Sequence, residues 1–147
     1  MANLKLTQAS AIIDAAIAEG RERNFALLAV AVLDAGGHII AVKREDGASF
    51  LRVELACGKA WGALGMGFGT RELAERAAKN PSFVAALSAV SEGRMVPSPG
   101  GVLVAGADAE VIGAVGISGD TGDNDEVCAL AGIKAVGLSA IPGARGK

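Results

Sequence analysis

Two pairs of short apolar segments, each joined by a tight turn, constrain the fold of this chain most strongly. The first pair, FALLAVAVLD (25–34) and HIIAVKRE (38–45), flanks the turn AGG. The second pair, residues 102–105 and 111–118, flanks GADAE (106–110). Apolar, β-branched runs bounded by turn residues are typical of strands, and a tight turn joins only antiparallel neighbours. The sequence therefore predicts two β-hairpins and excludes a parallel nucleotide-binding α/β sheet.

Helical patterns surround the two hairpins. The three- and four-residue spacing of apolar residues, together with capping and proline signals, predicts helices over residues 7–22, 50–64, 70–79, 81–90 and about 124–138. The resulting order, α-β-β-α-α-α-β-β-α, predicts an α+β fold in which helices flank an antiparallel sheet. We expect a single domain over residues 1–147, because this length supports one hydrophobic core.

The composition of the chain argues against nucleic-acid and membrane partners. The net charge of −2 and the 3% aromatic content offer neither phosphate clamps nor stacking surfaces, so we expect no nucleic-acid partner. No apolar run approaches the roughly 20 residues that span a bilayer, and the start MANLKLTQAS lacks an export signal. We expect a cytoplasmic protein without a membrane partner. Its 51% apolar content predicts burial in a homo-oligomer, and its two cysteines, Cys57 and Cys128, are expected to be reduced.

The central helix, 50–64, carries two cations on one face. Arg52 and Lys59 are two turns apart and lie roughly 120–140° from the centre of the apolar stripe, which is expected to be the buried face. That stripe consists of Phe50, Val53, Cys57, Ala60, Trp61 and Leu64. The two cations suit a carboxylate-bearing ligand or the acids of a partner subunit. A solvated charged face is the alternative.

Acidic residues gather at the start of the last predicted helix. The positive end of a helix favours acids, and one of these side chains suffices as a cap. Asp125 or Glu126 is then free to pair with Arg52 or Lys59 across a site or a subunit boundary; capping alone is the alternative.

Glycines mark further positions of interest. Gly113, Gly116 and Gly119 predict close passage of a strand beneath neighbouring backbone, or a bulge. Gly100 and Gly101 follow two prolines and permit a ligand to approach backbone amides, although a plain turn explains them equally well. Arg44 lies at the end of the second predicted strand, shortly before the central helix, and could bind an anion there.

Six segments in order carry a resemblance that spans nearly the whole chain. They are LTQASAIIDAAIAEG, VAVLDAGGHIIAVKREDGA, the pair Lys59-Ala60, SPGGVLV, VIGAVGISG and DEVCALAGIKAV. Together they resemble the GlcG/HbpS-like family, which also occurs as the C-terminal domain of PduO-type cobalamin adenosyltransferases. Trp61 and Leu103 depart from the family pattern near the expected pocket.

The resemblance implies an antiparallel sheet flanked by helices, assembly into dimers to octamers, and haem binding, with some members reported to degrade haem. Other members belong to catabolic operons. His38 is the histidine that could ligate haem iron, with an exposed turn residue as the alternative. We expect a pocket at or near a subunit interface for haem or another carboxylated molecule, lined by Arg44, Arg52, Lys59, Gly100, Gly101 and Glu126. The alternative is an enzyme of organic-acid or aromatic catabolism, an isomerase or tautomerase in which Glu126 or Asp125 moves a proton.

Overall fold

The computed structural model describes residues 3–145, so both ends of the predicted domain, residues 1–2 and 146–147, lie outside the described residues. The helices are α1 (Leu6–Glu22), α2 (Leu51–Met66), α3 (Thr70–Lys79), α4 (Pro81–Val90) and α5 (Gly122–Ala135). The strands are β1 (Ala29–Asp34), β2 (Ile39–Arg44), β3 (Gly101–Ala105), β4 (Val111–Ser118) and β5 (Ser139–Ile141). These elements confirm the predicted α+β class and the order of its first nine elements.

The strands form one antiparallel sheet in the order β2-β1-β4-β3-β5. The two predicted hairpins are β1–β2 and β3–β4, and they join through the pairing of β1 with β4. Strand β5 was not predicted. It follows the turn at Gly137 and pairs its three residues with the edge of β3, and so short a strand leaves no periodic signal in the sequence.

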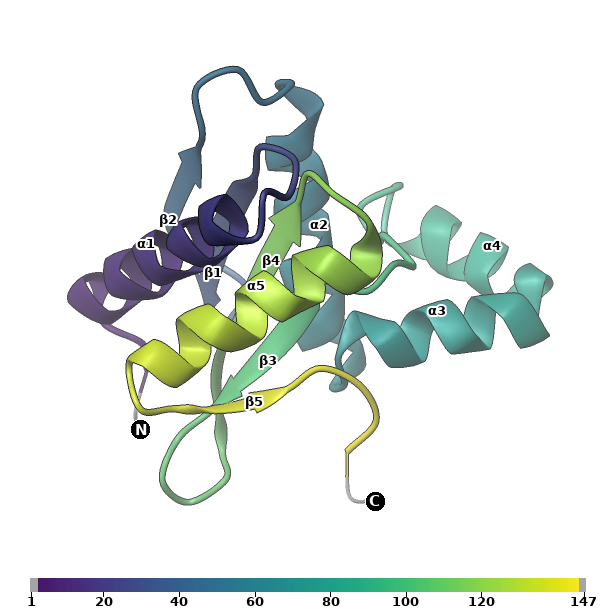
Figure 1. Ribbon diagram of the computed structural model, residues 1–147. Helices are drawn as coiled ribbons and strands as arrows, with labels where there is room; N and C mark the ends of the chain where they lie inside the picture. Colours follow the sequence, from purple (N-terminus) through teal and green to yellow (C-terminus); the bar gives the residue numbers. More distant parts are fainter. Residues whose placement is uncertain (1–2, 146–147) are drawn as a thin grey trace.

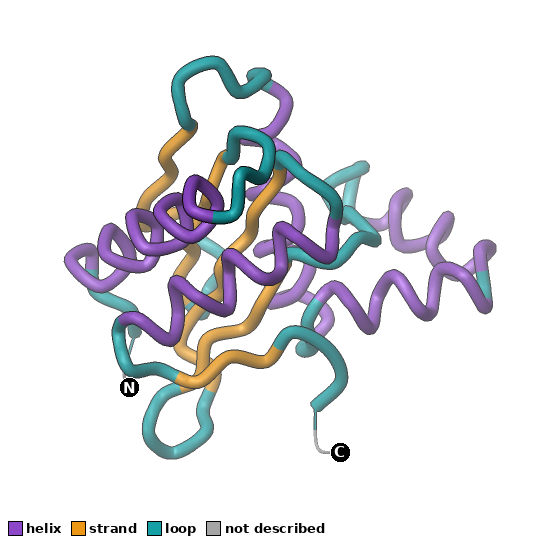
Figure 2. The backbone as a smooth tube through the Cα atoms, in the orientation of Figure 1, coloured by secondary structure: helices purple, strands orange, loops and turns teal. Residues whose placement is uncertain are grey.

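Helices cover both faces of the sheet (Figure 1). On one face α1 and α5 lie side by side, and on the other α2 crosses β1, β3 and β4. The backbone tube shows the same two helical layers enclosing the strands (Figure 2). Valine and isoleucine dominate the core beneath α1 and α5, whereas the core beneath α2 is built mainly of alanine. Strand β1 contributes to both, with Val30 and Val32 on one face and Ala29 and Ala31 on the other.

Glycines in β3 and β4 bring α2 into direct contact with the sheet. A Cβ atom on Gly116 would lie 1.9 Å from the carbonyl oxygen of Ala56, and one on Gly101 would lie 2.3 Å from that of Lys59. Similar backbone contacts surround Gly113 and Gly119. The prediction that these β4 glycines allow close backbone approach is therefore confirmed.

The predicted buried face of the central helix is correct only in part. Ala60 of the predicted stripe is buried, and Val53, Cys57, Trp61 and Leu64 are half-buried against the core beneath α2. Phe50 is 82% exposed, and the residues of α2 that are buried are Ala56, Gly58, Lys59, Ala60, Gly62 and Ala63. The reason is the short distance between α2 and the sheet, because only small side chains fit beneath a helix that touches strand backbone. The larger apolar residues are displaced to the side of the helix.

Helix α5 begins earlier than predicted. Its N-cap is Thr121, whose hydroxyl accepts the N–H of Asn124 at 3.2 Å, so none of the acids provides the cap. Helices α3 and α4 form a pair that projects from the rest of the molecule (Figure 1). None of the described helices combines the length and apolar character required to cross a membrane.

Candidate functional site

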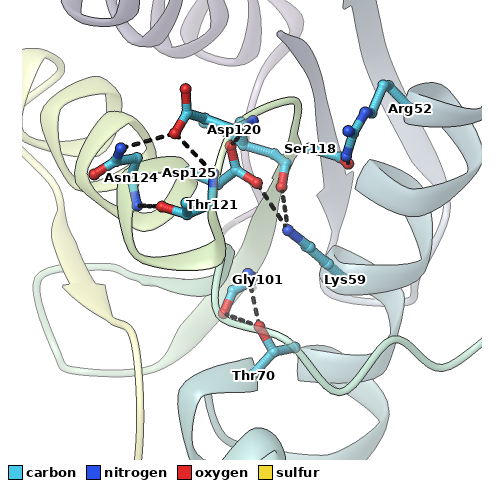
Figure 3. Close-up of polar contacts among 10 residues, drawn as sticks. Arg52, Lys59, Thr70, Gly101, Ser118, Asp120, Thr121, Asn124 and Asp125 are labelled. Atoms are coloured by element: carbon cyan, nitrogen blue, oxygen red, sulfur yellow. Dashed lines mark hydrogen bonds and ion pairs between the residues drawn. The ribbon is translucent and has the colours of Figure 1, made fainter. Parts of the chain in front are cut away.

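A buried ion pair joins the central helix to the last helix. The Nζ of Lys59 lies 3.1 Å from Oδ2 of Asp125, and it also donates to the carbonyl of Ile117 at 2.8 Å (Figure 3). The side chains of Lys59 and Asp125 are only 5% and 1% exposed. The other carboxylate oxygen of Asp125 accepts the N–H of Asp120 at 2.9 Å. The structure thus brings together two residues that the sequence offered as one of several pairings.

Burial governs the protonation of this pair. Desolvation lowers the pKa of Lys59 and raises the pKa of Asp125, while the attraction between the two charges opposes both shifts. Each charge therefore favours the ionised form of its partner, whereas burial disfavours it.

The two glycines after the prolines lie against this ion pair. Gly100 has φ +121°, and a Cβ atom there would lie 3.0 Å from Nζ of Lys59 and 2.9 Å from the carbonyl oxygen of Ile117. The N–H of Gly101 donates to Oγ1 of Thr70 at 2.8 Å. The Gly101 amide is therefore engaged within the chain.

Arg52 and Asp120 connect neighbouring loops to the pair. Arg52, two helical turns before Lys59, donates to Oγ of Ser118 at 3.0 Å (Figure 3). Asp120 accepts the N–H of Ala26 at 2.6 Å and the side-chain amide of Asn124 at 2.7 Å. These donors, the Ala26 N–H above all, hold the pKa of Asp120 below its usual value.

Glu126 pairs with a residue that sequence reasoning missed. The Nε of Arg71, at the start of α3, lies 2.9 and 3.2 Å from its two carboxylate oxygens, and a terminal nitrogen of Arg71 lies 2.5 Å from Asp123. An arginine beside a helix start carries no sequence signal for such a contact. Only the fold brings α3 to the start of α5.

Arg44 and His38 lie outside this cluster. Arg44 donates to the carbonyl of Ala48 at 2.6 Å and so closes the loop before α2. His38 is 81% exposed at the turn of the first hairpin, with Nδ1 3.2 Å from the carboxylate of Asp34. Backbone donors of His38 and Gly36 lower the pKa of Asp34. Within the described residues, no three potential metal-ligating side chains are grouped to hold an ion.

An open groove of about 530 Å³ lies along the side of α2, where the displaced apolar residues are. The hairpin supplies Leu33, Gly37 and Ile39 to its wall, and the segment before β3 supplies Arg94 and Val96. The contribution of α2 is Leu51, Val53, Glu54, Leu55, Cys57, Gly58 and Trp61. Burial raises the pKa of the Cys57 thiol, and both cysteines are free, as predicted. The groove thus contains much of the stripe that the sequence placed in the core.

Two residues of the groove lining, Trp61 and Arg94, are stacked on each other. The guanidinium carbon of Arg94 lies 3.7 Å from the centroid of the Trp61 ring. Gly58 makes this possible, because a Cβ atom there would lie 2.5 Å from the carbonyl oxygen of Arg94 and 2.9 Å from the Val96 side chain. The segment with Arg94 and Val96 therefore rests directly on the backbone of α2.

Replacing Gly58 with alanine is expected to lower the free energy of unfolding by about 1–3 kcal/mol, because the added methyl group meets a backbone carbonyl. Gly62→Ala on the same helix is the control. Its Cβ atom would lie 3.8 Å from the nearest side chain, so the better helix propensity of alanine should stabilise the protein by up to about 1 kcal/mol. Urea unfolding followed by circular dichroism measures both. Equal stabilisation by the two substitutions would contradict the close contact at Gly58.

Comparison with known proteins agrees with the architecture. The family model described as haem degrading protein HbpS-like matches residues 4–134. A relative from Citrobacter freundii, an uncharacterized 15.0 kDa protein of the dhaT-dhaS intergenic region, is 30% identical over 129 residues, which are 88% of this chain and 89% of that protein.

Solved structures of similar fold include one that is described as a haem complex. The crystal structure of a PduOC–haem complex superposes with a TM-score of 0.84 at 27% identity, covering 94% of this chain and 98% of the other. The crystal structure of HbpS gives a TM-score of 0.78 at 29% identity, covering 91% and 90%. The Klebsiella pneumoniae protein ORFY gives 0.83 at 25% identity, covering 93% of both chains.

Proposed function

Because this chain belongs to the family of HbpS-like haem-degrading proteins, we propose that it binds haem, with the porphyrin ring in the apolar groove beside α2. The observation that carries this placement is the groove itself. Its volume of about 530 Å³ is within the range of roughly 300–1,000 Å³ typical of ligand pockets. Most of its lining is apolar and includes one tryptophan, which suits an apolar macrocycle, and its charged residues are Glu54 and Arg94.

The chain offers two candidate donors for the iron, His38 and Cys57. Cys57 lines the groove, whereas His38 lies next to it in sequence, between Gly37 and Ile39 of the lining. The Nδ1 of His38 faces the carboxylate of Asp34, which leaves Nε2 as the atom to ligate a metal. Cys57 is the poorer donor, because its raised pKa disfavours the thiolate. Bound haem would supply an iron centre for oxygen or electron-transfer chemistry.

Exposed apolar residues at the groove support a site at or near an interface between two copies of the chain. Phe50, Leu51 and Ile39 are 82%, 56% and 61% exposed, and the last two line the groove. Such residues are buried by association rather than left in water. A second copy that covers them would also shield the outer face of a ring bound in the groove.

The predicted site around Lys59, Gly100 and Glu126 stays a prediction, as does the alternative of proton transfer by Asp125 or Glu126. The carboxylates of Asp125 and Glu126 are paired with Lys59 and Arg71. The groove offers open volume instead, and we therefore place haem there.

A haem titration tests both locations. The Soret band of haem should shift and saturate at no more than one haem per protomer. Leu55→Glu, which adds a second carboxylate beside Glu54 and removes an apolar side chain from the groove wall, should weaken binding at least about tenfold. Arg52→Met, at the ion-pair cluster, should bind as the unmodified protein does. His38→Ala should retain the porphyrin but alter the Soret spectrum by removing the iron ligand.

The opposite pattern, loss in Arg52→Met and retention in Leu55→Glu, would move the ligand to the predicted cluster. Absence of any Soret shift in the unmodified protein would reject haem binding. Sedimentation velocity of the same samples reports whether association accompanies binding.

A further inference from the structure

We propose that Arg94 selects the ligand of the groove by a free carboxylate, so that the site accepts flat, apolar molecules with an acidic edge. This inference rests on the proposed haem site and names the chemical class that the site takes. Arg94 is then a specificity-determining residue, although none of the sequence patterns pointed to it.

The first support is the unused hydrogen-bonding capacity of Arg94. Among residues 3–145, no carboxylate lies within ion-pair distance of its guanidinium group, in contrast to Arg71 and Lys59, which have acidic partners. Its guanidinium stacks on Trp61. Stacking occupies a face of the guanidinium plane and leaves the N–H groups in the plane to donate, which is the geometry that binds a carboxylate with two hydrogen bonds.

The second support is that the backbone holds Arg94 in place before any ligand binds. The N–H of Gly93 donates to the carbonyl of Ser88 at 2.7 Å, and the N–H of Arg94 donates to that of Ser91 at 3.2 Å. Gly93 has φ +78°, a left-handed conformation that glycine adopts without strain because it has no Cβ atom. On the other side, the carbonyl of Arg94 rests against Gly58. A cation already held at the groove loses little freedom when it binds an anion.

The charges of the groove also define an orientation. Its lining contains two charged residues, Arg94 and Glu54. A ligand carboxylate is attracted to Arg94 and repelled by Glu54, while the apolar residues of the lining suit an uncharged ring. The acidic edge of the ligand should therefore lie beside Arg94. Neither the attraction nor the repulsion depends on a metal in the ring.

Metal-free protoporphyrin IX and its dimethyl ester provide the test, because they share the ring and differ in free carboxylates. Binding is followed by quenching of the fluorescence of Trp61, the single tryptophan of the chain. The unmodified protein should bind the acid at least about tenfold more tightly than the ester. Arg94→Gln should reduce affinity for the acid to that for the ester and leave the ester unchanged, with Arg94→Lys in between.

Arg76→Gln is the matched control, because Arg76 also stacks on an aromatic ring, that of Phe68 at 4.5 Å, but does not line the groove. It should preserve the preference for the acid. Equal affinity of the unmodified protein for acid and ester would overturn the role of Arg94 while leaving the groove as the binding site. An equal loss of both ligands in Arg94→Gln would also overturn it, since Arg94 would then act only on the shape of the groove. Failure of both porphyrins to bind the unmodified protein would instead refute the haem site itself.

Discussion

Replacing Lys59 with methionine is expected to lower the free energy of unfolding by about 3–5 kcal/mol at pH 7, because it leaves the carboxylate of Asp125 buried without a cation. Methionine keeps the length and most of the volume of lysine, so the loss reports charge and hydrogen bonding rather than a cavity. Both side chains are almost fully buried, which prevents water from replacing the missing partner. Urea unfolding followed by circular dichroism gives the value.

The control is the double variant Lys59→Met with Asp125→Asn. Asparagine removes the charge and keeps an oxygen that can accept the N–H of Asp120. The double variant should therefore be more stable than Lys59→Met alone, and a double-mutant cycle gives the coupling energy. Additive losses would mean that the two side chains do not depend on each other for their charge.

The loss in Lys59→Met should also depend on pH. The pKa of Asp125 is already raised by burial above its value of 3.8, and removal of the neighbouring cation raises it further. A carboxyl with a raised pKa binds its proton more tightly in the folded state, so its penalty is full above that pKa and is relieved as the pH falls through it. The difference from the unmodified protein should therefore shrink between pH 7 and mildly acidic pH. A constant difference would contradict this account.

Gly116→Ala is expected to cost at least about 3 kcal/mol, because the new methyl group would lie 1.9 Å from the carbonyl oxygen of Ala56 and 2.8 Å from the N–H nitrogen of Ala60. Both atoms belong to the backbone of α2, so no side-chain rotation relieves the clash and the helix must move off the sheet. Gly116 has no positive φ, which separates this effect from strain in the main chain.

Thermal unfolding of Gly116→Ala beside Gly62→Ala measures the effect, since both variants add the same methyl group to a protein with the same core. A variant that fails to accumulate as folded protein agrees with the expectation. A melting temperature equal to that of the unmodified protein would show that α2 does not rest on β4 as described.

The hairpins illustrate what the sequence could predict. Each strand is a local apolar run between turn residues, and the pairing follows from the short connection, so no distant contact has to be known. The sequence also predicted that neighbouring backbone passes close to Gly116, because glycine inside a strand often marks a close backbone approach or a bulge. Strand β5 and the ion pairs of Arg71 with Asp123 and Glu126 could not be predicted, because each depends on a segment far away in the sequence.

The face that α2 buries was mispredicted in part, for a physical reason. Periodicity ranks faces by the size and hydrophobicity of their side chains, and that ranking favoured the stripe with Phe50 and Trp61. The face of the sheet beneath α2 consists mainly of glycine and alanine, with Leu33 and Leu103, and it accepts only small residues together with the long, thin side chain of Lys59. Much of the predicted stripe therefore lies at the side of α2 and lines the groove, where Trp61 stacks with Arg94.

Local patterns in the chain were enough to determine the α+β class, the two hairpins and the family, because these depend on the spacing of residues along the backbone. The separation between α2 and the sheet was decided only in three dimensions. That separation depends on glycines of β3 and β4 meeting backbone atoms of a helix about 40 to 60 residues earlier. It selected which cation is buried with an acid and which one remains at the open groove where we propose that a ligand binds.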